Sequence, residues 1–211
     1  MIDKQLKFAS IPDTFKDMRL STFSVGVYED KKVAKVTVDM IKYWFSGLDS
    51  NINDGIGLYM FSAAKGSGKT RMAASIANEL MYQKNIPVRF TTSVQIINEI
   101  KSSWDIKGAD ENRILQMLST IKILVVDDFG AEVTKDWIGE RFYHIINERY
   151  VNKLITIYTS NSSIDKLDYD ERIKNRILER SLLIPFPEES VRAAIAKKRQ
   201  QEMIEAISKK E

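Results

Sequence analysis

The sequence predicts an α/β fold in which helices cover both faces of a mostly parallel sheet. Strand-like and helix-like patterns alternate along its 211 residues, which is typical of parallel α/β domains. The apolar run at residues 123–126 indicates a strand that is buried on both of its faces. A β-type run at residues 56–61 enters a glycine-rich turn, and a helical pattern follows at once. Together these observations predict a three-layer α/β/α sandwich with five strands.

The first part of the chain shows little periodicity. We expect residues 1–29 to form a mostly irregular arm and residues 30–211 to form a single domain. Asp30 is a suitable helix cap, and apolar residues recur after it at helical spacing as far as Leu48. The polar residues 49–55 are expected to form the loop that leads to the first strand of the sheet.

The alternation continues to the end of the chain. Further strands are predicted at residues 88–92, 121–128, 154–159 and 181–186. Pro185 places the last strand at an edge of the sheet, because proline cannot donate a ladder hydrogen bond. The predicted helices are residues 69–84, residues 93–104 with Ser93 as the cap, residues 111–121, 134–152 and 165–180, and a charged helix after Glu188.

The composition excludes several classes of protein. The chain has 44% hydrophobic and 29% charged residues, as soluble globular proteins do, and no apolar run approaches the length of a membrane span. The absence of cysteine excludes disulfides and thiolate metal sites, and the single histidine leaves little material for a histidine site. We therefore expect a cytoplasmic protein that does not act at a membrane. The net charge of +3 does not by itself indicate nucleic-acid binding.

The glycine-rich turn matches a phosphate-binding loop. Residues 63–70 satisfy the pattern G-x-x-x-x-G-K-[ST] except at the first position, where Ala63 replaces glycine. Alanine is compatible with that position only if its φ stays below zero. Lys69 would reach the β- and γ-phosphates of ATP, and the Thr70 hydroxyl would hold Mg²⁺. The predicted cofactor-binding residues here are Ala64, Lys65, Gly66, Ser67, Gly68, Lys69, Thr70 and Arg71.

Polar residues end two of the predicted strands. Asp127 and Asp128 close the buried run, and Asn161 follows the next strand. Ligands bind beyond the carboxyl ends of parallel strands, and buried carboxylates of like charge need a cation to compensate them. We predict that Asp127 holds Mg²⁺, that Asp128 polarises the attacking water, and that Asn161 orients that water or the γ-phosphate. An exposed acidic turn, and a cap or turn role for Asn161, are the alternatives.

Three segments resemble one known family. Residues 63–70, 123–132 and 158–161 resemble AAA+ ATPases of the bacterial replicative helicase-loader family, the DnaC/DnaI type, to which the IstB transposition helpers are similar. The segment Asp-Asp-x-Gly-Ala-Glu at residues 127–132 is the most specific of the three. The resemblance covers about residues 10–195. It implies an AAA+ P-loop NTPase with a Walker A loop, a Walker B strand and a sensor 1 residue at the positions described above.

The resemblance also gives meaning to arginines near the end of the chain. The segment 171–177 is similar to the one that carries an arginine finger, which reaches the nucleotide of the next subunit. Arg176 is the first candidate for this finger and Arg172 the second. Their spacing of four, continued by Arg180, equally fits a solvated helix face. Arg192 is similar to a sensor 2 arginine.

The function that the resemblance implies is helicase loading. A loader of this family binds and hydrolyses ATP, forms a homo-oligomer through nucleotide-bridged interfaces, and places a hexameric replicative helicase on single-stranded DNA. The matching DNA region here contains Lys101, Trp104, Lys107 and Arg113, where cations would follow phosphates and an aromatic ring could stack on a base. Trp104 is equally compatible with a core position. The basic groups at residues 197–199 and 209–210 are typical of a solvated helix face.

Departures from the family pattern leave rival interpretations. Ala63 in the loop could weaken nucleotide binding. Typical loaders carry an additional N-terminal domain before the ATPase core, so either the arm or a separate protein would contact the helicase. One rival is an IstB-like helper that acts on a transposase and duplex DNA. Another is a nucleotide-gated scaffold with negligible hydrolysis. A small-molecule kinase is less favoured, because nothing resembles an acceptor-binding lid.

Overall fold

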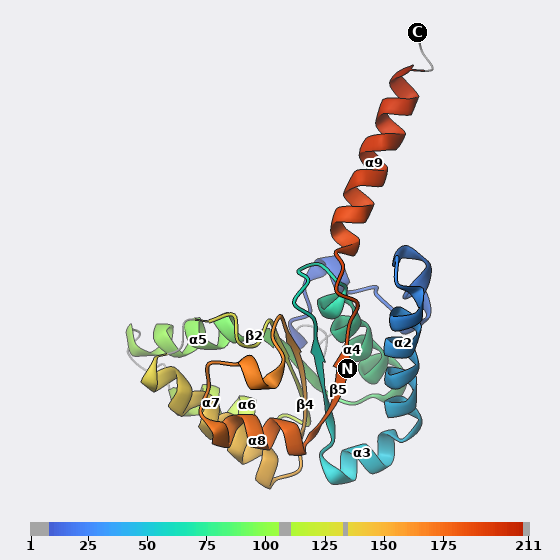
Figure 1. Cartoon of the computed structure of the whole chain (residues 1–211). Helices are drawn as coiled ribbons and strands as arrows, with labels where there is room; N and C mark the ends of the chain where they lie inside the picture. Colours follow the sequence, from blue (N-terminus) through green and yellow to red (C-terminus); the bar gives the residue numbers. More distant parts are fainter. Residues whose placement is uncertain (1–8, 106–110, 133–134, 209–211) are drawn as a thin grey trace.

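A parallel sheet forms the middle layer of the protein (Figure 1). The computed structural model describes residues 9–105, 111–132 and 135–208. The strands of the sheet in this part of the chain are β1 (Gly57–Phe61), β2 (Val88–Thr92), β3 (Ile123–Asp127), β4 (Ile155–Ser160) and β5 (Ser181–Pro185). They lie in the order β2-β3-β4-β1-β5, and every neighbouring pair is parallel. The predicted five-stranded sheet is confirmed, with β5 at an edge.

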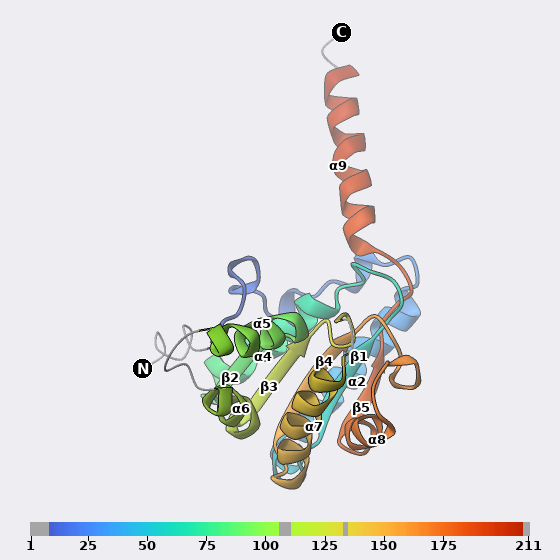
Figure 2. The ribbon, with the colours of Figure 1, turned by 90° about the vertical axis from the view of Figure 1, so that its left-hand side faces the viewer.

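Helices cover both faces of the sheet (Figure 1 and Figure 2). One face carries α2 (Lys31–Ser46), α3 (Leu48–Asp54) and α4 (Lys69–Lys84), and the other carries α5 (Ser93–Asp105), α6 (Glu111–Thr120), α7 (Asp136–Val151) and α8 (Glu171–Glu179). Side chains alternate between the two faces along each strand. In β3, Ile123 and Val125 join the core under α4, whereas Leu124 and Val126 join the core under α7. The three-layer prediction is therefore confirmed.

The segment before β1 is a helix, so the prediction of a loop at residues 49–55 was wrong. Helix α3 begins after Gly47 and is anchored by the buried side chain of Leu48. Gly55 ends it with a φ of +70°, and a Cβ at that position would lie 2.6 Å from backbone atoms of Lys153. A helix of two turns with one well-buried apolar residue leaves no periodic pattern to detect.

The start of α5 also differs from the prediction. Thr92, rather than Ser93, is the cap: its Oγ1 accepts the N–H of Gln95, and the Gln95 side chain accepts the N–H of Thr92. This is a reciprocal capping box. The side chain of Ser93 is buried and donates instead to the carbonyl of Asp128 at 2.9 Å.

The predicted helix at residues 165–180 is two elements. A short 3₁₀ turn, η4 (Ile164–Lys166), is followed by an extended link and then by α8. Asp170 caps α8, because its side chain accepts the N–H of Arg172. This cap separates the two helical segments, which share no continuous backbone ladder.

The described part of the arm packs against α4. It contains three 3₁₀ turns, η1 (Asp13–Phe15), η2 (Leu20–Thr22) and η3 (Val25–Val27). Buried Asn78 of α4 donates to the carbonyls of Phe15 and Met18, each at 2.9 Å. These contacts hold the arm beside the helix that follows the phosphate loop. The division into an arm and one domain stays a prediction.

The last helix, α9 (Val191–Ser208), extends away from the three layers (Figure 1). Its Met203 and Ile207 side chains are exposed. Among the residues that the structure describes, no helix has both the length and the apolar character needed to cross a membrane.

Candidate active site

The predicted phosphate loop and the two aspartates lie at the same edge of the sheet. Strands β3, β4 and β1 are consecutive neighbours, so their carboxyl ends are adjacent. Burial lowers the pKa of the Lys69 ammonium, and the charges of Asp128 and Asp127 lie close enough to oppose that effect. The Thr70 hydroxyl lies near enough to the Asp127 carboxyl to lower its pKa, against the larger effect of burial, which raises it. The structure thus brings Lys69 and Thr70 to the same edge as Asp127 and Asp128, although the two pairs are about sixty residues apart in the sequence.

The loop requires glycine at two positions. Gly66 and Gly68 have φ values of +82° and +98°. A Cβ at Gly68 would lie 2.6 Å from the hydroxyl oxygen of Tyr28. Ala63 is not among the described residues with positive φ, so the condition for alanine at the first position is met.

Lys69 is buried and its ammonium is bonded within the loop. Nζ donates to the carbonyls of Ser62 and Ala64, both at 3.1 Å, and to the Ser67 hydroxyl at 3.2 Å. Burial lowers its pKa, whereas the charges of Asp128, Glu188 and Asp127 act in the opposite direction. These carbonyl bonds hold the ammonium beside the N–H groups of the loop, where a phosphate oxygen would be its partner.

Asp127 is a buried carboxylate in a site that suits Mg²⁺. Its side chain is 4% exposed, and burial raises its pKa to about 6. The hydrogen bond from Thr159, the nearby Thr70 hydroxyl and the charge of Lys69 lower this pKa, while the charge of Asp128 raises it. A carboxylate and a hydroxyl oxygen are ligands that Mg²⁺ prefers, with the remaining positions filled by phosphate and water. No group of three acidic or histidine side chains that could hold a metal occurs among the described residues.

Asp128 lies on the turn after β3 with an exposed side chain. Its φ is +52°, a value that aspartate adopts more readily than most residues. Its N–H donates to the Thr159 hydroxyl at 2.9 Å, so the same hydroxyl serves both aspartates. Asn161 directly follows β4, and its side chain makes no hydrogen bond among the described residues. Its amide is therefore not committed to a cap, and its predicted role at the γ-phosphate stays a prediction.

Three residues around the loop were missed by sequence reasoning. The Glu188 carboxylate accepts the N–H groups of Ala63 and Ala64, both at 3.0 Å. The Tyr28 hydroxyl donates to the carbonyl of Ser67 at 2.7 Å. Thr159 is the third. Of the three, Thr159 alone could have been found from the sequence, as a hydroxyl residue two positions before Asn161. No short-range pattern connects residues 28 or 188 with the loop.

Arg192 reaches the loop through its backbone. Its N–H donates to the carbonyl of Gly66 at 3.4 Å, and Ser190 caps α9 by accepting the N–H of Ala193. The Arg192 side chain is exposed. Arg71 instead bonds the arm, since its guanidinium donates to the carbonyl of Thr22 at 2.8 Å. The nucleotide contacts predicted for both arginines stay predictions.

The two candidate finger residues lie away from the loop of their own chain. Helix α8 ends at the amino-terminal end of β1, where Arg180 accepts the N–H of Gly57 through its carbonyl. Arg176 donates to the Asn147 side chain at 2.9 Å and lies over the ring of Tyr143. The Arg172 side chain is 66% exposed and is bonded to Asp170 at 2.9 Å. This placement fits either a finger that acts on a neighbouring subunit or a solvated helix face, so the finger stays a prediction.

The predicted DNA region is partly described. Trp104 is 53% exposed, which contradicts a core position; it donates to Glu111 and lies edge-on to Trp137. Lys101 lies over the ring of Trp137, with Nζ 5.8 Å from its centroid. Arg113 is exposed. Lys107, like residues 209–210, lies outside the described residues.

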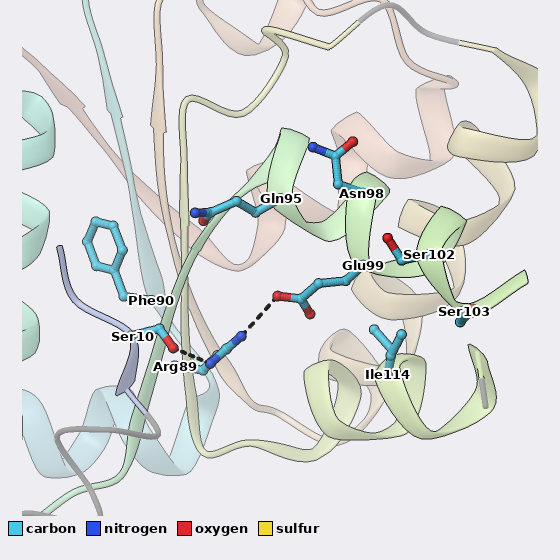
Figure 3. A pocket seen from close by; sticks show the side chains of 9 residues that line it. All are labelled: Ser10, Arg89, Phe90, Gln95, Asn98, Glu99, Ser102, Ser103 and Ile114. Atoms are coloured by element: carbon cyan, nitrogen blue, oxygen red, sulfur yellow. Dashed lines mark hydrogen bonds and ion pairs between the residues drawn. The ribbon is translucent and has the colours of Figure 1, made fainter. Parts of the chain in front are cut away.

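A hollow of about 490 Å³ lies away from the phosphate loop, between β2, α5 and α6 (Figure 3). Arg89 at its floor forms an ion pair with Glu99 at 3.1 Å and also donates to Ser10. Most of its other lining residues are uncharged polar side chains, among them Gln95, Asn98, Ser102 and Ser103. A cation that is already paired gives this hollow no preference for phosphate, so it is not part of the site.

A family model matches a large part of this chain. The model of the IstB-like ATP binding protein family matches residues 56–199. The chain belongs to this family. The match includes the phosphate loop, both aspartates, Asn161 and the arginine candidates, and it confirms the family that the sequence resembles.

Relatives of known role share part of their length with this family member. The replicative helicase loader DnaC of Escherichia coli (strain K12) is 28% identical over 146 residues, which are 68% of this chain and 59% of that protein. The replicative helicase loader DnaI of Bacillus subtilis (strain 168) is 31% identical over 144 residues, 63% of this chain and 45% of that protein. The chain thus spans about half the length of these relatives.

Solved structures share the fold. The crystal structure of the DnaC helicase loader has a TM-score of 0.71 at 23% identity, over 83% of this chain and 100% of that chain. AMPPCP-bound DnaA from Aquifex aeolicus has a TM-score of 0.66 at 20% identity, over 92% of this chain and 56% of that chain. The fold is therefore that of the AAA+ P-loop NTPases, as predicted.

Proposed function

We propose that this protein binds ATP with Mg²⁺ at the carboxyl edge of its sheet and hydrolyses it. The observation that carries this proposal is the meeting of Lys69 and Thr70 with Asp127 and Asp128 at that edge. Their residue types and order along the chain are those of a phosphate loop and a metal-binding strand end.

Each side chain has a separate task in this proposal. The N–H groups of residues 66–70 and the Lys69 ammonium hold the phosphates, because both present positive charge at the start of α4. The Thr70 hydroxyl and the Asp127 carboxylate hold Mg²⁺, which neutralises negative charge on the phosphates. The exposed carboxylate of Asp128 orients the attacking water, and the amide of Asn161, which directly follows the neighbouring strand β4, orients that water or the γ-phosphate. The pKa of Asp127 is raised by burial, which is consistent with a carboxylate whose charge a bound cation would compensate.

Hydrolysis in this proposal depends on a second copy of the chain. Arg176 and Arg172 are on α8, away from the loop of their own chain, so either one would complete the site of a neighbour. An arginine supplied in this way stabilises charge that develops on the γ-phosphate. Assembly would then be nucleotide-bridged, and turnover would rise with protein concentration.

The proposed client is a hexameric replicative helicase that is placed on single-stranded DNA. The relatives named replicative helicase loaders support this client. Exposed Trp104 with Lys101 and Arg113 gives the α5–α6 side an aromatic ring and positive charge, which suit single-stranded DNA. The arm lies against α4 and is the proposed contact with the helicase if no separate protein supplies it.

The decisive experiment compares Lys69→Ala with Lys84→Ala, which removes an exposed lysine from the far end of the same helix. ATP affinity is measured with a fluorescent analogue, and turnover is measured with and without single-stranded DNA. Lys69→Ala is expected to lose nucleotide binding while Lys84→Ala keeps it. Equal affinities in the two variants would reject the phosphate site.

Two rivals give different results in the same assays. The family includes the IstB-like proteins, which favours a transposition helper as the second candidate. Strong binding to duplex DNA, with no co-purification of a hexameric helicase from the native cell, would support that helper. A nucleotide-gated scaffold would bind ATP but show the same negligible turnover in the wild type and in Asp128→Asn.

A further inference from the structure

The turn that follows β3 is fixed to β4. The N–H of Asp128 donates to the Thr159 hydroxyl, and the N–H of Phe129 donates to the Thr159 carbonyl at 2.8 Å. The Ser160 hydroxyl donates to the carbonyl of Phe129 at 2.7 Å. The turn therefore keeps the position of the proposed catalytic aspartate, and any shift of Asp128 moves the turn with it.

The same turn is tied to the residue that precedes the cap of α8. The Tyr169 ring stacks on Phe129, with centroids 5.0 Å apart and planes 2° apart. The Tyr169 hydroxyl donates to Oε1 of Glu132, which also accepts the N–H of Gly130 at 3.2 Å. A Cβ at Gly130 would lie 2.5 Å from Leu167, so the two segments are in close contact. Burial and then the charge of Glu132 raise the pKa of Tyr169, which keeps its hydroxyl a donor at physiological pH.

The contacts continue from Tyr169 to a candidate finger. Asp170 is the next residue, and its Oδ1 accepts both the backbone N–H of Arg172 at 2.8 Å and the Arg172 guanidinium at 2.9 Å. Arg176 is one helical turn further along α8. The position of α8 thus depends on Tyr169, and Tyr169 is held by the turn beside Asp128.

We propose that Glu132 and Tyr169 are positioning residues, which join the turn beside Asp128 to the start of α8 and so set where this chain presents its arginines to the next subunit. The inference rests on the proposed function. It goes beyond that function because neither residue is expected to touch ATP, Mg²⁺ or water of the reaction. Glu132 is committed to the Tyr169 hydroxyl and the Gly130 N–H, which makes it a structural acceptor here.

The test variant is Tyr169→Phe, which removes the hydroxyl and keeps the stacked ring. Tyr150→Phe is the matched control, because Tyr150 also donates its hydroxyl to a glutamate, the exposed Glu179 at the far end of α8. Tyr169→Phe is expected to keep the ATP affinity of the monomer and to lose roughly ten-fold in assembly-dependent turnover. That is the size of effect expected when one hydrogen bond to a charged acceptor is lost. Tyr150→Phe is expected to match the wild type. Glu132→Gln retains an acceptor and is expected to lie between them.

Mixing subunits separates positioning from damage to the site. Lys69→Ala has an intact α8 but no nucleotide site, whereas Tyr169→Phe keeps its site. An equimolar mixture should recover turnover, because the arginine of one variant completes the site of the other. If the mixture stays as slow as Tyr169→Phe alone, the hydroxyl serves its own site and the inference is overturned.

A readout without hydrolysis keeps the inference testable if the proposed function fails. The chain has no cysteine, so spin labels can be placed at Glu140→Cys on α7 and Glu171→Cys on α8, whose side chains are 71% and 76% exposed. Tyr169→Phe is expected to broaden the distance distribution between the labels, and Tyr150→Phe is not. An unchanged distribution in Tyr169→Phe would reject the inference, whereas absent turnover in the wild type would reject only the proposed ATPase.

Discussion

The Thr159 hydroxyl of β4 donates to Oδ1 of Asp127 on β3 at 2.5 Å, and it accepts the N–H of Asp128 at 2.9 Å. One hydroxyl therefore orients the buried carboxylate and fixes the backbone of its exposed neighbour. Groups that orient a metal ligand usually matter almost as much as the ligand itself.

Replacing Thr159 by valine tests this relationship. Valine has the shape of threonine but neither donor nor acceptor, so Asp127 loses its orienting bond. The affinity for a fluorescent ATP analogue in Mg²⁺ is expected to fall by at least about ten-fold, with a smaller change in EDTA. Thr120→Val, whose hydroxyl only donates within α6, is the control. Equal dependence on Mg²⁺ in both variants would contradict the role of Thr159.

The buried Asp127 makes stability depend on pH in the metal-free protein. Its pKa is raised from 3.8 to about 6, chiefly by burial, so the folded state holds this proton more tightly than the unfolded state does. The contribution of Asp127 to the free energy of unfolding is therefore highest below about pH 4 and falls as the pH rises through 6. Asp127→Asn should remove that fall, with a gain of up to roughly 3 kcal/mol at neutral pH that shrinks toward pH 4. Urea unfolding in EDTA measures it; a gain that is independent of pH would refute the assignment.

Glu188 places a carboxylate at the entrance of the phosphate loop. It orders the N–H groups of Ala63 and Ala64, but its charge also lies near Lys69. Glu188→Gln removes the charge and keeps one of the two acceptor oxygens, so ATP affinity is expected to rise about three-fold or more as repulsion of the phosphates is relieved. Glu189→Gln is the control, because Glu189 bonds the N–H groups of Glu29 and Asp30 instead. Weaker ATP binding by Glu188→Gln would show that its charge is needed in the loop.

The two finger candidates can be separated by kinetics. Arg176→Ala and Arg172→Ala should both leave ATP binding by the monomer intact, because neither side chain is near the loop of its own chain. The true finger is expected to lose at least about a thousand-fold in assembly-dependent turnover, and the other much less. Turnover is measured over a range of protein concentrations. If both variants turn over as fast as the wild type, the arginines are a solvated face.

The buried side chain of Arg149 lies far from the site and is expected to contribute strongly to the stability of the fold. It is 1% exposed and donates to the carbonyls of Leu118, Ile121 and Ile155 and to the Thr156 hydroxyl. Arg149→Met leaves these buried acceptors without a donor, which should lower the free energy of unfolding by at least about 3 kcal/mol. Exposed Arg199→Met should change it by less than about 0.5 kcal/mol. Equal urea midpoints for the two variants would contradict this account.

Much of the fold could be predicted because its signals are local. The five strands are short runs of β-forming residues between clear breaks, and the buried stripe of α4 repeats over four turns. The errors fall where the decisive contact is distant or the element is short. Helix α3 depends on one buried leucine, and Ser93 is drawn away from capping by the carbonyl of Asp128, 35 residues later.

The sequence by itself determined the alternating α/β order, the phosphate loop at residues 63–70 and the acidic strand end, because each depends on a pattern of residues that are neighbours in the chain. Only the tertiary structure decided which distant groups surround them. It placed Tyr28 and Glu188 on the loop, Thr159 on Asp127, and Tyr169 between the turn and α8. These contacts arise from strand order and segment packing, and a periodic pattern along one segment carries no information about what another segment will bring to it.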